Sequence, residues 1–389
     1  MLIEIHMIQN HSPANLNRDD LGAPKTCIFG GVTRARISSQ CLKRSIRRSP
    51  EFAAALEKDG GVRTRRLIEL IAKAAAGEGK EPDEKNREAI RKVFENGGVP
   101  LKKDEDTFEI LFFLPQSAVN EMGKAVRTGN GDLGKNFAEI IGKFVNTPDI
   151  ALCGRMTEFD AKGVFADLKG KFTVEAALSA AHAISTQAVV NEVDYFTAAD
   201  DAPGQDAGAA HVNEAMFNSA CFYKHFVIDF EQLRKNLAND ADLACKTVRS
   251  FLVAAAKAHP SGKQHAFAAF NPPDGVLVEV KTKWATPVSF ANAFADPVPE
   301  KSERGLIGES IARLGQYAHD LVVGYGIEAE RFWFSPNLRH RLTWVDKSMK
   351  EHEQEQSVVG SDEFGKFGEF VNKVMDKIVA AGTPAEAAK

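Results

Sequence analysis

The sequence lacks the features of a membrane-spanning or disulfide-bonded protein. No run of eighteen apolar residues occurs in its 389 residues, so we expect no transmembrane helix. Residues 1–5 have no basic segment ahead of an apolar stretch, so we expect no signal peptide. The five cysteines are scattered and include no C-x-x-C pair, which argues against a disulfide framework and a structural zinc site. We therefore expect a cytoplasmic protein without membrane contacts.

Motifs for nucleotide cofactors and common catalytic centres are also missing. Neither G-x-G-x-x-G nor G-x-x-x-x-G-K-[ST] occurs, no histidine pair has H-x-x-x-H or H-E-x-x-H spacing, and no nucleophile elbow is present. We expect no cofactor, no metal ion and no catalytic residue. One loop carboxylate pair, Asp19 and Asp20, could hold Mg²⁺ or act as a base, or could simply cap a turn.

Positive charge is concentrated near the N-terminus. The net charge of the chain is −4, yet residues 1–50 contain eight basic and three acidic residues, a local balance of +5. A basic segment within an acidic chain is typical of a polyanion site confined to one surface. A solvated, charge-laced surface would give the same count.

Strand and helix patterns are interleaved, which indicates an α+β fold. Residues 2–8 alternate and predict a half-buried strand, followed by a polar loop at 9–26. Further strands are predicted at 34–37, 150–153, 265–270 and 276–280, whereas the patterns at 108–114 and 177–187 are ambiguous. Helices are predicted at 40–48, 51–59, 64–76, 83–95, 117–127, 133–145, 230–237, 241–258, 302–323 and 362–380.

A projecting hairpin is predicted in the middle of the chain. Strand patterns at 193–196 and 220–229 flank residues 198–210, which are rich in Ala, Asp and Gly and predict a flexible tip. The last residues, 382–389, are predicted to fray.

The most informative stretch is a basic helix with a polar N-terminus. Ser38 and Ser39 offer an N-cap, which leaves backbone N–H groups available to an anion. Helical spacing then places cations in two rows, Lys43 with Arg47 and Arg44 with Arg48, and Gln40 lies one turn earlier. This set suits a run of phosphates, although an ordinary surface helix also favours cations near its C-terminus.

Two weaker groups of residues could contact nucleic acid. Tyr195 and Phe196 in the hairpin, and Met156 after Arg155, could stack on or wedge between unpaired bases. The pattern alone favours Tyr195 and Phe196 as core anchors of the hairpin. Lys263-Gln264 could touch phosphates or base edges, but as an isolated dipeptide it is weak evidence.

These stretches together resemble the CasC-type backbone subunit of the type I-E CRISPR Cascade, an RNA-guided surveillance complex. The similar blocks are collinear over about residues 5–326, whereas 51–146 and the tail past residue 334 carry little match. They are HSP at 11–13, LNRDD at 16–20, FGG at 29–31, RISSQ at 36–40, LKR at 42–44, ALCGRM at 151–156, AHAI at 181–184, DYFTA at 194–198, KQ at 263–264, AAFNP at 268–272, SFANAF at 289–294 and GYG at 324–326.

The resemblance implies a hand-like fold. Its palm is a modified RNA-recognition-motif, ferredoxin-like domain, with a helical fingers insertion and a protruding β-hairpin thumb. The implied boundaries are palm at 1–50, 147–192 and 219–334, fingers at 51–146, thumb at 193–218, and a C-terminal helix with a frayed tail at 335–389.

The resemblance also implies a non-catalytic RNA-binding function. Copies of the chain would form a helical filament along one CRISPR RNA, kink it at regular intervals and present it for pairing with a target DNA strand, together with other Cascade subunits. The implied contacts to the RNA backbone are Arg18, Lys25, Arg36, Ser38, Gln40, Lys43, Arg44 and Arg47. Met156 and Phe196 would brace the kink with Tyr195 beside them, and Arg155, Lys263 and Gln264 are further candidates.

The rival hypothesis is a metal-dependent endoribonuclease. Backbone subunits in related CRISPR subtypes cut RNA with a loop aspartate, and Asp19 or Asp20 would be the candidate here.

Overall fold

The structure is a computed structural model that describes residues 1–56, 59–103, 105–144, 146–197, 212–299, 301–346 and 355–382. The chain forms two compact units. The first comprises Met1–Phe52, Ser179–Ile228 and Arg249–Lys389, and the second comprises Ala53–Leu178 and Asp229–Val248. Within the described ranges, no helix combines the length and apolar character needed to cross a membrane.

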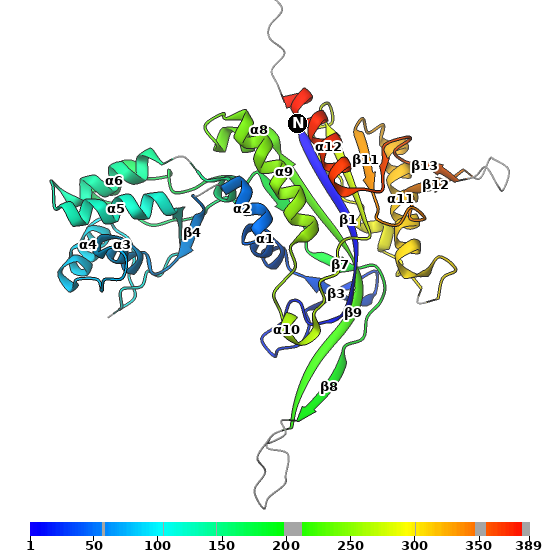
Figure 1. Cartoon of the computed structure of the whole chain (residues 1–389), viewed down its shortest axis with the longest axis horizontal. Coiled ribbons are helices and arrows are strands. Elements are labelled where there is room, and N and C mark those ends of the chain that lie inside the picture. The colour runs from blue at the N-terminus through cyan, green and yellow to red at the C-terminus, as the bar shows by residue number, and fades with distance from the viewer. Residues whose placement is uncertain are drawn as a thin grey trace, which may run out of the picture. The chain divides into compact units, whose positions relative to one another are not determined.

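A large mixed sheet is the framework of the first unit (Figure 1). Its strands lie in the order β14-β11-β10-β1-β9-β7-β3-β2, and β6 and β8 also pair with β9. Strands β1, β10 and β11 are antiparallel neighbours, whereas β11 and β14 are parallel. The strands are β1 (Leu2–Ala14), β2 (Thr26–Phe29), β3 (Val32–Ile37), β6 (Leu178–Ala180), β7 (Ala183–Ser185), β8 (Glu192–Thr197), β9 (Val212–Asp229), β10 (Gly275–Lys281), β11 (Glu330–Phe334) and β14 (Glu363–Phe364).

Helices cover both faces of this sheet. Trp333 on β11 joins a buried cluster with Leu314 of α11 (Gly305–Tyr325), which therefore covers one face. The next residue, Phe334, packs on Phe370 of α12 (Phe367–Gly382), so α12 covers the other face. On that face Phe226 of β9 also contacts α9 (Ala241–Lys257). Alternate side chains of a strand point to opposite faces, so both faces contribute to the core.

The prediction of a half-buried first strand is wrong. Strand β1 lies between β10 and β9, and its polar residues Glu4 and His6 are fully buried like their apolar neighbours. Their polar groups have partners distant in sequence: Lys281 Nζ lies 2.7 Å from Glu4 Oε1, and Tyr223 Oη lies 2.8 Å from His6 Nδ1. The strand also continues to Ala14, through the first part of the predicted loop.

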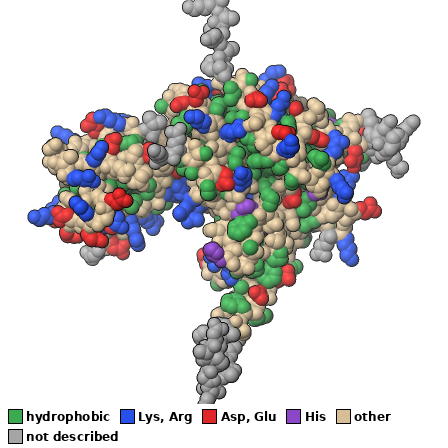
Figure 2. All heavy atoms as spheres, in the orientation of Figure 1, with side chains coloured by type: hydrophobic (Ala, Val, Ile, Leu, Met, Phe, Trp, Pro, Cys, Tyr) green, Lys and Arg blue, Asp and Glu red, His purple; other side chains and the backbone are tan. Residues whose placement is uncertain are grey.

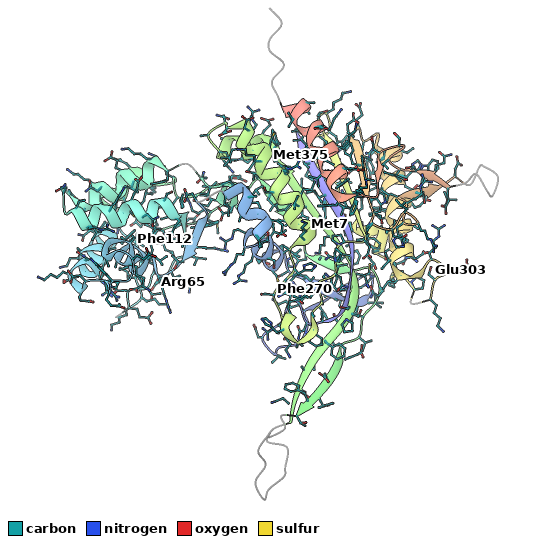
Figure 3. The ribbon with its side chains drawn as sticks, in the orientation of Figure 1. Met7, Arg65, Phe112, Phe270, Glu303 and Met375 are labelled. Carbon is teal, nitrogen blue, oxygen red and sulfur yellow. The ribbon has the colours of Figure 1, made fainter. Side chains whose placement is uncertain are left out.

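The second unit is a helical cluster with a phenylalanine core. Phe94, Phe108, Phe112, Phe137 and Phe165 are buried together, and Figure 3 marks Phe112 inside this cluster. The elements of this unit are β4 (Gly61–Thr64), α3 (Leu67–Ala76), α4 (Glu84–Asn96), β5 (Phe112–Pro115), α5 (Gln116–Thr128), α6 (Leu133–Lys143), α7 (Pro148–Cys153), η1 (Gly163–Leu168) and α8 (Phe230–Asn236).

Two predicted strands are helices. Residues 150–153 belong to α7, which Pro148 begins and Gly154, with φ at 73°, ends. Residues 265–270 overlap α10 (Gln264–Phe267), which is bounded by Lys263 and Ala268, both at positive φ. At α7 the proline at the first helical position and the terminal glycine are local helix signals, which the apolar run 150–153 obscured. The ambiguous stretches resolve into β5 and, for 177–187, into β6 and β7.

The other predicted helices are confirmed, with shifted ends. Besides those named above they include α1 (Ser39–Arg47) and α2 (Pro50–Leu56). Short elements that the sequence did not reveal are η2 (Ala291–Phe294), β12 (Thr343–Val345) and β13 (Glu355–Ser357), together with β2, β4, β11, β14 and η1.

A hairpin projects from the main sheet, as predicted (Figure 1). Strand β8 pairs with the first part of β9, from Glu192 opposite Phe217 to Thr197 opposite Val212. The predicted second arm, 220–229, is instead the part of β9 that lies in the main sheet, where Phe222 pairs with Ser185. The predicted tip at 198–210 and the end at 383–389 fall outside the described residues.

Candidate nucleic-acid interface

Helix α1 has the capped, basic form that the sequence predicts. The Ser38 hydroxyl accepts a hydrogen bond from Cys41 N at 3.3 Å, and Leu42 and Ile46 are buried beneath the helix. Ser38 itself is buried, whereas the other candidates reach the surface. Gln40, Arg44 and Arg48 are exposed, and Lys43 and Arg47 are half-buried. The helix is thus held in place by its N-cap and its buried side chains, and it presents cations to solvent.

Asn17 joins the preceding loop to this helix. Its side-chain Oδ1 accepts from Ser38 N at 2.8 Å, and its carbonyl oxygen accepts from Lys25 N at 2.8 Å. Lys25 in turn accepts from Arg36 N at 2.8 Å through its own carbonyl. Three predicted RNA contacts from two segments, Lys25 from one and Arg36 and Ser38 from the other, are thereby held beside one another.

An open hollow of about 540 Å³ extends this surface. Arg18, Asp20 and Arg44 line it together with Ser261 and Gly262. A side chain at Gly262 would lie 2.5 Å from the Leu16 carbonyl oxygen, so only glycine allows the 261–263 segment to approach this closely. The fold therefore brings the segment before Gln264 next to the basic N-terminal region, which sequence spacing does not indicate.

Lys263 and Gln264 have different environments. Lys263 is half-buried at the start of α10. Gln264 is buried, and its side-chain amide donates to the Pro260 carbonyl oxygen at 3.0 Å. Gln264 thus holds the turn around α10, and its contact with RNA remains a prediction. Phe270, just past this turn, is exposed (Figure 3).

The loop aspartates both line this hollow but differ in their hydrogen bonds. Asp19 Oδ1 accepts from Leu21 N and from Ala23 N, both at 2.9 Å, so this carboxylate caps its own turn. Asp20 is exposed in the same turn. Carboxylates that cap turns are common in loops.

Asn15 connects the same loop to the hairpin. Its buried side-chain amide donates to the Gly22 carbonyl oxygen at 2.9 Å and to the Met216 carbonyl oxygen at 2.8 Å. Met216 lies on β9 opposite Val193 of β8. One amide group therefore fixes both the loop and the base of the hairpin.

The hairpin aromatics are exposed rather than buried. Tyr195 is 70% exposed and Phe196 47% exposed, so neither is a core anchor of the single chain. Hydrophobic side chains are visible toward the end of the described hairpin in Figure 2. Its described arms carry the carboxylates Glu192, Asp194 and Glu214 and no lysine or arginine. Side-chain cations on these arms therefore do not attract nucleic acid, which leaves stacking, apolar contact and neutral hydrogen bonds.

Arg155 and Met156 belong to the second unit. The Arg155 guanidinium donates to the carbonyl oxygens of Phe172 at 2.8 Å and Phe113 at 3.0 Å, and burial lowers its pKa to about 10. Arg155 therefore ties segments of this unit together. Met156 is 81% exposed, as a base-contacting side chain requires.

One group of described residues has the composition of a metal site. Atoms of Glu4, His6 and His225 lie within 4.8 Å of one another, and all three residues are buried. The two imidazole rings, however, are stacked at 4.5 Å with an interplanar angle of 9°, so their in-plane lone pairs do not converge. The ammonium of Lys281 already pairs with Glu4. The arrangement suits a buried ion network better than a bound ion.

Comparison with known proteins identifies the family. The family model of the CT1975-like proteins matches residues 3–359. The chain belongs to the CT1975-like protein family. No curated protein matches the sequence.

Two solved structures with the same fold are chains of CRISPR complexes. A chain of a "CRISPR RNA-guided surveillance complex, pre-nicking" is 29% identical, with a TM-score of 0.80, and the match covers 97% of this chain and 100% of that one. A chain of a "CRISPR RNA-guided surveillance complex" is 24% identical, with a TM-score of 0.60, covering 97% of this chain and 99% of that one. This CT1975-like protein thus has the mixed α+β fold of subunits of such complexes.

Two residues that organise the basic surface were missed by the sequence analysis. Asn17 lies inside the LNRDD block, where an asparagine in a polar loop could have indicated a turn-stabilising role. His182 lies inside the AHAI block, and its Nδ1 is 2.9 Å from Nη1 of Arg36. Neither position shows a charge pattern, so only the tertiary structure reveals them.

Proposed function

We propose that the chain is a non-catalytic RNA-binding backbone subunit of a type I-E CRISPR Cascade complex. The observation that carries the proposal is the full-length structural match to a subunit of an RNA-guided surveillance complex, at a TM-score of 0.80. In this proposal several copies line one CRISPR RNA in the cytoplasm, beside other Cascade subunits, and leave its bases available for pairing with target DNA.

The chemistry of the basic surface supports a role in which the protein binds the RNA backbone and the RNA bases read the target. Contacts to phosphates fix the position of an RNA but carry no sequence information, and in guided complexes base pairing reads the sequence. Arg18, Lys25, Arg36 and the α1 cations supply charge, and the capped start of α1 supplies backbone N–H groups. The proposed surface therefore grips any guide sequence equally.

The exposed apolar side chains support a second role. Met156, Tyr195 and Phe196 are exposed in the single chain, where they cost hydrophobic free energy without contributing to the core. We assign them to the kinked bases of the RNA, with the hairpin as thumb, the sheet as palm and the helical insertion as fingers. The partition at 1–50, 51–146, 147–192, 193–218, 219–334 and 335–389 remains part of this proposal.

The RNA content of the purified protein tests the proposal. The chain is expressed with a CRISPR array and its partner subunits, purified under native conditions, and its RNA is extracted and sized. A discrete RNA of uniform length that carries the array repeat is expected. Protein that carries no RNA, or a broad mixture of cellular RNA, would overturn the proposal.

A cleavage assay separates this scaffold from an endoribonuclease. Asp19 caps its own turn, which counts against a role in catalysis, and Asp20 remains the exposed carboxylate. The complex is incubated with complementary RNA and Mg²⁺, and no cleavage is expected. Cleavage that disappears in Asp20→Asn or Asp19→Asn would establish the rival function.

A further inference from the structure

His182 is held in one tautomer by Arg36. Arg36 Nη1 lies 2.9 Å from His182 Nδ1, and Arg36 Nε also donates to the Thr26 carbonyl oxygen at 3.2 Å. A guanidinium has donors only, so Nδ1 must be the acceptor, and a neutral imidazole then carries its proton on Nε2. The hydrogen bond thereby fixes Nε2–H as the free donor of the ring.

This donor faces a cationic environment at the surface. His182 is exposed, and none of the residues that the structure describes bonds its Nε2. The charged groups that act on the ring are Arg36 from β3 and Lys25 from the segment before β2, both cations. Partial burial, and then these two charges, lower the pKa of His182. An exposed imidazole N–H whose ring is acted on by a guanidinium and an ammonium is a suitable hydrogen-bonding site for an anionic oxygen.

We propose that His182 is a further RNA contact, whose Nε2–H donates to a phosphodiester oxygen and whose protonation on binding makes the RNA affinity depend on pH. The proposal rests on the RNA-binding function proposed above and deepens it. It commits to the RNA backbone as ligand because Lys25 and Arg36 already belong to that proposed contact surface.

The direction of the pH dependence follows from the charges. In the free chain the two cations disfavour imidazolium, so His182 is neutral near pH 7. A bound phosphate is an opposite charge and raises the pKa of the ring, so binding takes up a proton as the pH falls. This proton enters at Nδ1, because Nε2 already carries one, and it displaces the N–H that Arg36 donates there. The affinity therefore increases toward acid pH, by at most about tenfold per pH unit for one proton.

Two isosteric variants separate the neutral donor from the protonation. In His182→Asn the amide oxygen replaces Nδ1 as acceptor for Arg36, but no group replaces Nε2–H. In His182→Gln the amide nitrogen replaces the Nε2–H donor but cannot take up a proton. The control is His319→Gln, which alters a half-buried histidine stacked on Trp344 outside the basic surface. Filter binding measures the affinity of each full-length chain for one single-stranded RNA at pH 8 and pH 6.

The expected pattern distinguishes this proposal from the function on which it rests. The wild type and the control gain affinity between pH 8 and pH 6. At pH 8 the affinity of His182→Asn for RNA is about two- to tenfold lower than that of the wild type, which corresponds to one hydrogen bond. Neither His182 variant gains affinity between pH 8 and pH 6. If Lys43→Ala weakens RNA binding but His182→Asn matches the wild type at both pH values, this inference alone is overturned. If the wild type binds no RNA at either pH, both the His182 contact and the proposed RNA-binding function are overturned.

Discussion

At the scale of single residues, the buried polar layer of β1 is the feature that sequence could not foresee. Glu4 and His6 alternate with Ile3 and Ile5 in the manner of a strand with one wet face. Their partners, Lys281 and Tyr223, lie more than two hundred residues further along the chain. The local pattern predicts a strand, but it does not tell whether the polar side of the strand meets water or a layer of polar partners. The strand was therefore predictable, and the burial of its polar side was not.

This layer makes stability sensitive to acid. Burial and the nearby His225 lower the pKa of His6 to about 4. Burial alone would raise the pKa of Glu279, but His6, Lys281 and Arg331 outweigh it and hold that pKa below its usual range. Both groups then bind protons more readily in the unfolded chain than in the folded one. Stability is lost as the pH falls from about 6.5 through 4 for His6 and below about 4.5 for Glu279.

Denaturant melts at several pH values check this dependence. Between pH 6 and 5 we expect the free energy of unfolding to fall by at most about 1.4 kcal/mol per pH unit from His6. His6→Gln should unfold more easily at pH 7.5 yet show a flatter profile between pH 6.5 and 4. His265→Gln, at an exposed position, should retain the wild-type slope. Equal slopes in wild type and His6→Gln would contradict the assignment.

Phe196 provides the second prediction at this scale. Because it is half exposed on β8, Phe196→Ala should barely change the melting temperature of the isolated chain. In the assembled complex the loss of base stacking, roughly 1–3 kcal/mol per base, is repeated in every copy along the RNA. We therefore expect a large loss of assembly on RNA, measured by sedimentation.

Two controls define the meaning of the Phe196 result. Tyr325→Ala removes an exposed aromatic from the end of α11 and should leave assembly unchanged. Phe94→Ala removes a buried ring and should cost about 3–5 kcal/mol of stability. A melting loss of that size in Phe196→Ala, with normal assembly, would return Phe196 to a structural role.

At the scale of elements, prediction succeeded where the signals are local. Ser38 is the N-cap of α1, and Pro50 is the first residue of the next helix. Because of these two signals, the boundaries of α1 were predicted to within one residue. The same kind of signal marks α7, where Thr147 precedes the helix, Pro148 is its first residue and Gly154 ends it, yet its apolar run was interpreted as a strand. Gln264 illustrates the limit: its type suggested RNA contact, but its orientation depends on the α10 turn.

Helix α1 carries a prediction about salt. For single-stranded nucleic acid, the logarithm of affinity falls with the logarithm of salt concentration by about 0.7 per neutralised phosphate. Lys43→Ala with Arg47→Ala should therefore flatten that slope by about one unit or more and weaken all RNA sequences alike. Binding titrations from low to high salt measure it. The matched control, Lys366→Ala with Lys377→Ala at α12, should leave the slope unchanged. If the α1 variant also leaves the slope unchanged, α1 is an ordinary solvated helix that does not bind RNA.

At the scale of the whole molecule, the proposed function requires an open assembly. Copies that join head to tail form a helical filament when the rotation from one copy to the next does not close a ring. Replacing residues 198–210 by a short turn should preserve the circular dichroism spectrum and melting temperature, because the described arms pair without them. It should prevent filament formation on guide RNA, as seen by electron microscopy. Full-length particles formed by the shortened chain would show that the hairpin is not the thumb.

The buried amide of Asn15 has a mechanical consequence. Because it bonds both Gly22 and Met216, the loop that carries Arg18 cannot swing away while the hairpin base stays in place unless a buried hydrogen bond breaks. The two segments should therefore open together, as one unit of local unfolding, and their amide protons should exchange with solvent at matched rates. A force on the hairpin would then be transmitted through the Asn15 amide to the loop that carries Arg18.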